Sequence, residues 1–203
     1  MVKDEETGRV RVEDYLTLLA SAAGEAVLVA SGIVDVEFND LNPGGAILGA
    51  AINDVLSGDK ASFTGLPADS ALGILVERLV PDVFPIELFG SMDDLFKHVV
   101  TNFGQAPWGE VATTVPERNK PAILPLKAAF DLRDAVTAVQ EELGLPVAQR
   151  HIPCVNALAF ALEQTKSAIE SDVAVTLSLE VLFTMSKMVP VPKHALIDED
   201  EEK

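Results

Sequence analysis

Apolar residues recur at three- and four-residue spacing along most of the chain, which is the period of an amphipathic α-helix. The pattern breaks at glycines and prolines such as Gly58, Pro81 and Gly144, which are common where helices end. We therefore predict a mainly α fold, a single-domain helical bundle of about seven helices. The expected helices cover residues 12–34, 43–57, 68–80, 91–104, 126–143, 153–170 and 172–189.

Two of these helices have specific start signals. Asn42 is a good capping residue and Pro43 suits the first helical position, ahead of the segment that Gly58 closes. Ser91 followed by Asp94 resembles a capping box with a shorter acid. We expect a helix to begin at each of these two places.

The segment 172–189 is consistent with two structures. Its apolar residues alternate as in a strand, but Thr176, Glu180 and Thr184 form a polar stripe with helical spacing. Strands rarely exceed about ten residues, so the length of the pattern favours a largely buried helix.

Residues 104–125 interrupt the helical pattern and contain the only tryptophan, Trp108. The segment is punctuated by Pro107, Gly109, Pro116, Pro121 and Pro125. Loops of this length are usually functional or have extended structure of their own. We consider short β elements at 33–38 and 111–115, and 104–125 as a candidate internal boundary.

The two ends of the chain differ from its middle. We predict a flexible acidic arm at 1–9, a helical domain at 10–189 and a Pro-containing acidic tail at 190–203. Most of the acidic excess nevertheless lies within the helical domain, because the ends hold only a few of the acids.

The composition restricts the classes of partner. The chain combines 48% hydrophobic residues with a formal net charge of −17. Nucleic acids and anionic membrane surfaces attract proteins largely through Lys and Arg, so both are disfavoured as partners.

The longest stretch without a charged residue, 41–53, has 13 residues, whereas about 18 or more apolar residues are needed to span a bilayer. We expect no nucleic-acid partner and no membrane span.

Cysteine content and the first residues indicate the compartment. Cys154 is the only cysteine, so no intramolecular disulfide can form. The first residues lack the basic start and apolar run of a signal peptide. The expected location is the cytoplasm.

Common catalytic and nucleotide-binding signatures are absent, so we assign no catalytic residue, metal or cofactor. Two spaced pairs are candidates for contact with a ligand or partner. Asp94 and His98 lie four apart, where a carboxylate can meet an imidazole. His151 and Cys154 lie three apart and suit metal ligands or a nucleophile with its base, although a buried thiol beside a loop histidine is the interpretation we favour.

Four acids lie within apolar helical segments, and their convergence would suit a dinuclear metal site. They are Glu25, Glu77, Glu163 and Glu180. Di-iron bundles use Glu-x-x-His twice, and no acid lies three positions before a histidine here. We therefore assign these four carboxylates to polar stripes that face solvent.

Two further contact candidates lie outside the regular pattern. Asn42, Gly44 and Gly45 offer backbone N–H groups at an expected helix start, where anions can bind, although capping alone explains the same residues. Trp108 is either an anchor for a partner or a pin that holds the loop to the core.

From these features we expect a non-enzymatic association protein, either a homo-oligomeric scaffold or an adaptor. Its support is an apolar fraction beyond the needs of one core. One alternative is a helical bundle that binds a small apolar ligand or lipid. A second alternative is an enzyme based on carboxylate and histidine groups.

Overall fold

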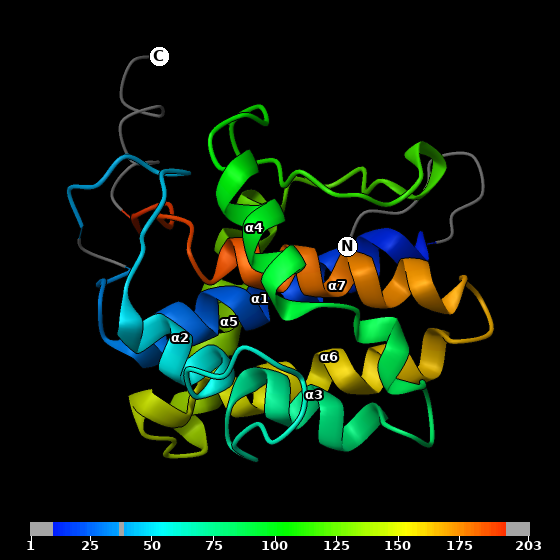
Figure 1. Cartoon of the computed structure of the whole chain (residues 1–203). Helices are drawn as coiled ribbons and strands as arrows, with labels where there is room; N and C mark the ends of the chain where they lie inside the picture. Colours follow the sequence, from blue (N-terminus) through cyan, green and yellow to red (C-terminus); the bar gives the residue numbers. More distant parts are fainter. Residues whose placement is uncertain (1–9, 37–38, 194–203) are drawn as a thin grey trace.

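The computed structural model describes residues 10–36 and 39–193 (Figure 1). Within them the chain forms seven α-helices and no strand, which confirms the predicted mainly α fold. The α-helices are α1 (Val12–Ser31), α2 (Ala50–Ser57), α3 (Ala71–Leu79), α4 (Met92–Asn102), α5 (Pro125–Glu142), α6 (His151–Thr165) and α7 (Ser171–Met185). Three 3₁₀ turns accompany them, η1 (Ile86–Phe89), η2 (Glu117–Asn119) and η3 (Val147–Gln149).

Helices α1 and α7 lie side by side at the centre of the molecule, with α3 and α6 on one side and α4 on the other (Figure 1). Their close approach depends on Gly24, because a Cβ there would lie 2.6 Å from the Cβ of Met185. One hydrophobic core joins residues from before and after the 104–125 loop.

Helix α7 confirms the helical interpretation for residues 172–185, whereas residues 186–189 of the predicted helix lie beyond its end. Nearly every residue from Val173 to Met185 is buried, because α7 packs against α1, α4 and η1. A helix that is covered all round needs no single apolar stripe. The apparent strand-like alternation therefore comes from complete burial.

Helix α1 is long and apolar enough to cross a membrane, and 61% of the relevant segment is buried inside the protein. It packs against α5, α6 and α7, so its hydropathy is that of a core helix.

The predicted helix start at Asn42 is wrong, because α2 begins only at Ala50. Residues 42–45 instead form a turn in which the Gly45 N–H donates to Asn42 O at 3.0 Å. Gly44 has a φ of +83°, and proline followed by such a glycine is typical of a type II turn. The turn pairs with the chain after α7: Gly44 N–H donates to Val189 O, and Val189 N–H donates to Gly45 O.

Neither β element is present in the described residues. Residues 33–36 and 111–115 form no strand, and 37–38 lie outside the described residues. The backbone of 111–115 bonds to side chains in place of another strand: the Thr114 N–H donates to the Glu180 carboxylate at 2.8 Å, and Ala112 O lies 2.9 Å from His98 Nε2.

The long loop is fastened to the helices by buried acids. Glu180 also accepts the Thr114 hydroxyl at 2.6 Å, and Asp14 accepts the Ala122 N–H at 2.6 Å. Both carboxylates are almost fully buried. The loop, whose regular structure is the 3₁₀ turn η2, is thus held in place because these carboxylates accept hydrogen bonds from its backbone N–H groups.

The chain after α7 packs against the helical domain beyond residue 189, where the sequence predicts that the tail begins. Residues 190–192 are buried, and Val191 O accepts a hydrogen bond from Arg133 Nη1 at 2.7 Å. The arm at 1–9 and residues 194–203 of the predicted tail lie outside the described residues.

Candidate functional site

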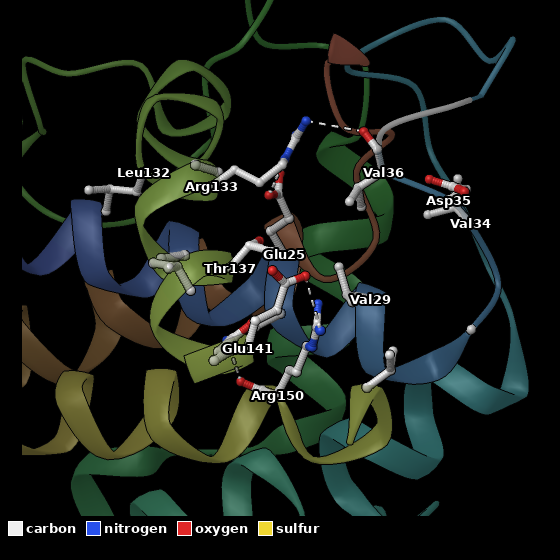
Figure 2. A pocket seen from close by; sticks show the side chains of 17 residues that line it. Glu25, Val29, Val34, Asp35, Val36, Leu132, Arg133, Thr137, Glu141 and Arg150 are labelled. Carbon is white, nitrogen blue, oxygen red and sulfur yellow. Dashed lines mark hydrogen bonds and ion pairs between the residues drawn. The ribbon is translucent and has the colours of Figure 1, made fainter. Parts of the chain in front are cut away.

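A groove of about 520 Å³ lies between α1 and α5, and residues of the 32–36 segment and of η3, together with Arg150, complete its lining (Figure 2). Small and branched apolar side chains form its walls, including Ala22, Ala26, Val29, Leu132, Val136 and Val147. Charged and polar groups of α1, α5 and the residue before α6 are set among them: Glu25, Arg133, Thr137, Gln140, Glu141 and Arg150.

Glu25 and Arg133 form an ion pair across the groove. Arg133 Nε and Nη2 donate to the two Glu25 oxygens at 2.7 and 2.8 Å, the bidentate geometry that guanidinium and carboxylate favour. The side chains are only 7% and 8% exposed. Arg133 Nη1 donates to Val36 O and Val191 O. This arginine therefore ties together α1, α5, the 32–36 segment and the chain after α7.

Arg150 is far less completely bonded. Its Nη2 lies 3.7 Å from Glu141 Oε1, and its side chain is 18% exposed. Its Nε is buried and has no hydrogen-bond partner among the described residues. Figure 2 shows the Arg150 and Glu141 side chains meeting at the groove. Arg150 thus contributes a guanidinium with only a distant carboxylate partner to the lining of the groove.

A second cavity of about 310 Å³ gathers three of the residues that the sequence indicated: Gly44, Gly45 and Trp108. Trp108 Nε1 donates to Pro43 O at 3.2 Å, and the tryptophan side chain is 60% exposed. Trp108 thus fastens the loop to the 42–45 turn from outside the core. Asn42 contributes its carbonyl to that turn.

His98 lies beside this cavity but does not bond to Asp94. Its Nε2 contacts Ala112 O at 2.9 Å and its Nδ1 accepts from Asn102 Nδ2 at 3.1 Å. Glu180 Oε1 is 3.6 Å from Nε2. The predicted pairing is absent because both ring nitrogens of His98 contact Ala112 and Asn102, while Asp94 is exposed at the start of α4, where its N–H donates to the Ser91 hydroxyl at 3.3 Å.

His151 and Cys154 share α6 but have separate partners. His151 is buried and its Nε2 contacts Asp69 O at 2.8 Å. The Cys154 sulfur accepts from Gln140 Nε2 at 3.4 Å, and burial raises the pKa of this thiol to about 11. A thiol that stays protonated near neutral pH is a weak nucleophile.

The four acids of the dinuclear-metal alternative have separate surroundings. Glu77 is exposed and Glu163 is half-buried, whereas Glu25 and Glu180 are buried and fully engaged by Arg133 and Thr114. The expectation that all four face solvent is thus wrong for Glu25 and Glu180. Within the described residues no three His, Cys, Asp or Glu side chains form a metal-binding group.

Sequence reasoning missed the two arginines of the α1–α5 groove. Arg133 is 108 positions from Glu25, and no local pattern links positions so far apart. The available signal was the acid itself: Glu25 interrupts an apolar segment, and a buried acid requires a partner. Arg150 had no comparable signal.

Comparison with protein-family models, curated proteins and solved structures finds no match for this chain. The evidence for its function is therefore the geometry of the α1–α5 groove and of the surface around it.

Proposed function

We propose that the protein is a non-catalytic binding protein whose α1–α5 groove accepts a small organic molecule. The observation that carries this proposal is a volume of about 520 Å³ whose lining combines ten apolar residues or glycine with seven polar or charged ones. In small-molecule sites apolar walls supply affinity and polar groups fix orientation.

The site differs from the one expected for an apolar ligand. A bundle that encloses an apolar ligand needs open faces on its most apolar helices, but α7 is buried against protein. On the other central helix, α1, Ala26 and Val29 near its end line the groove beside Glu25. The occupant therefore meets charged groups as well as alkyl side chains.

The rigidity of the groove also supports binding. Arg133 joins both helices and two flanking segments through four hydrogen bonds. A site that is fixed before binding loses less conformational entropy when a ligand arrives. The buried ion pair therefore holds the two helices that line the groove in a fixed position.

A pair of tryptophan variants on α5 tests this proposal. Thr137 lines the groove, whereas the neighbouring Ala138 is exposed. We expect Thr137→Trp to fill the groove and abolish the rise in Tm that a binding compound gives the wild type in a small-molecule screen. Ala138→Trp should retain that rise.

The proposal is wrong if compounds stabilise both tryptophan variants equally, or if a broad screen of organic molecules stabilises neither the wild type nor Ala138→Trp. Native mass spectrometry of the freshly purified protein supplies a second measurement, in which a bound organic mass in the wild type should be missing from Thr137→Trp.

Self-association is a second candidate function, favoured by one corner of the surface. Val139, Leu143 and Val147 lie at the end of α5 and the start of η3 and are 55%, 64% and 50% exposed. Apolar residues gathered on a surface often mark contacts between proteins. A second copy seated there would cover part of the α1–α5 groove, because Val147 lines it.

Light scattering tests association. We expect a dimer mass for the wild type at micromolar concentration and a monomer mass for Leu143→Glu. The matched control is Phe160→Glu, which changes a residue on α6 that is 51% exposed and should leave the dimer intact. A monomeric wild type would contradict this candidate.

A further inference from the structure

We propose that Arg150 binds the carboxylate of an organic acid whose apolar body lies in the α1–α5 groove. This inference rests on the proposed small-molecule function and names the chemical class of the ligand. In this proposal Arg150 determines the preference for a carboxylate over an uncharged ligand.

The two arginines of the groove differ in their unused donors. Arg133 uses Nε, Nη1 and Nη2 in hydrogen bonds of 2.7–3.1 Å. The Nη2 of Arg150 is beyond hydrogen-bond distance of Glu141, and the Arg150 side chain is still partly exposed. Its Nε is buried and has no acceptor among the described residues, so Nη2 is the donor that a ligand can meet. Arginine stays charged in proteins, and Arg150 is therefore the arginine of the groove that can still gain a close acceptor.

Glu141 does not satisfy that demand. Its side chain is 64% exposed and reaches Arg150 only at 3.7 Å, so the pair is a weak one. The Glu141 carboxylate can turn into solvent when a ligand oxygen approaches Nη2, whereas the buried Nε is out of reach of a ligand in the groove. A planar carboxylate matches the fork of guanidinium donors.

The charge of the groove favours a carboxylate over a phosphate. The Arg133 charge is already balanced by Glu25, which leaves one guanidinium for the ligand. Glu141 and Asp35 also line the groove, and carboxylates repel a dianion more strongly than a singly charged group. The charges thus favour a singly charged acid over a dianion, and we take a monocarboxylic acid as the ligand class because its planar group fits a single guanidinium.

The apolar walls define the rest of the ligand. Ala26 and Val29 of α1, Val136 of α5 and Val147 of η3 all line the groove together with Arg150. These side chains can contact a short alkyl chain or one aromatic ring, and burying such a group supplies most of the affinity.

Matched acids and amides test the inference. The probes are a series of alkyl and aryl carboxylic acids, each paired with its primary amide of the same shape, and binding is measured by NMR titration of the whole chain. We expect the best acid to bind about tenfold more tightly than its amide, as a charge-assisted pair provides. Arg150→Gln should remove this preference, so that the acid and its amide bind with similar affinity.

Three variants sharpen the result. Arg150→Lys should keep part of the preference, because the charge remains without the planar fork. Glu141→Gln should strengthen acid binding a few-fold, because it removes the competing carboxylate. Arg118→Gln is the matched control, since Arg118 is exposed and pairs with Glu170; it should leave binding as in the wild type. Thermal melts confirm that each variant is folded.

Each outcome has one meaning. Equal binding of acid and amide that Thr137→Trp abolishes would overturn the carboxylate inference and leave the groove as a binding site. An acid preference that survives in folded Arg150→Gln would also overturn it. If no probe of either kind binds the wild type at millimolar concentration, the carboxylate inference is wrong, and the separate compound screen decides the broader proposal.

Discussion

Glu25 and Arg133 form a buried ion pair in which each side chain balances the charge of the other. Both side chains lie almost completely out of solvent, where an ion pair recovers its desolvation cost only through good geometry and further hydrogen bonds. The bidentate contact and the two carbonyls bound by Arg133 meet that condition. Removing one partner leaves the other charge unbalanced inside the protein.

We predict that Glu25→Leu lowers the free energy of unfolding by about 3–5 kcal/mol, because it isolates the Arg133 charge. Urea unfolding measures the change. The double variant Glu25→Leu with Arg133→Met should lose clearly less than the sum of the two single variants. Additive losses would show that the two side chains do not depend on each other.

Lys187 is a second buried charge, and it has no acidic partner in the described residues. Its Nζ donates to Asn53 Oδ1 at 2.7 Å and lies 5.8 Å from the centre of the Phe96 ring, and the residue is 1% exposed. Burial lowers the pKa of this amine to about 8. The folded protein therefore releases the proton at a lower pH than the unfolded chain, whose lysine pKa is about 10.4.

This difference predicts the direction of a pH effect. Between about pH 8 and pH 10.4 the unfolded chain binds more protons at Lys187 than the folded chain, so the contribution of Lys187 to stability rises with pH. We expect the difference in unfolding free energy, wild type minus Lys187→Met, to increase from pH 7 to pH 10. Chemical unfolding of both proteins measures it, and a flat or falling difference would contradict the lowered pKa.

At the scale of elements, the contact between α1 and α7 depends on the absence of one side chain. A Cβ at position 24 would lie 2.7 Å from Leu182 O, a backbone atom that cannot move alone, and 2.6 Å from the Cβ of Met185. The two central helices must then separate or shift along each other. Such overpacking costs about 1–3 kcal/mol.

We therefore predict that Gly24→Ala destabilises the protein by about 1–3 kcal/mol in thermal or urea unfolding. Helix propensity alone gives the opposite sign, because alanine is favoured over glycine in a helix by about 1 kcal/mol. The sign of the measured change thus decides between the two effects. A stabilised variant would show that α1 and α7 are less closely packed than described.

The sequence predicts most helices but not the contacts between them. Apolar periodicity is local, so it locates α5 and α7 within a few residues. The turn at Asn42 resembles a helix start in sequence, because both structures favour proline at the second position. The hydrogen bonds of Gly44 and Gly45 with Val189, which distinguish the turn from a helix, are not visible in the local sequence. The groove escaped prediction for the same reason, since Glu25 and Arg133 meet only after α1 and α5 pack.

At the scale of the whole molecule, the net charge of −17 acts against compactness. Exposed ion pairs act in the other direction: Lys127 with Asp131, Arg118 with Glu170, and Lys193 with Asp134. Exposed pairs of this kind each contribute little, about 0–1 kcal/mol. With acids outnumbering bases 32 to 15, repulsion between carboxylates should exceed the gain from these pairs.

We predict that NaCl stabilises the protein, because salt shortens the screening length to about 8 Å at physiological strength and weakens long-range repulsion. The Tm should rise by several degrees between low salt and about 0.5 M NaCl at pH 7, and choline chloride should act alike if screening is the cause. The buried pair of Glu25 and Arg133 is largely shielded from salt, so it does not offset this gain. A Tm that falls with salt would show that the exposed ion pairs, and not the excess of acids, dominate the surface electrostatics.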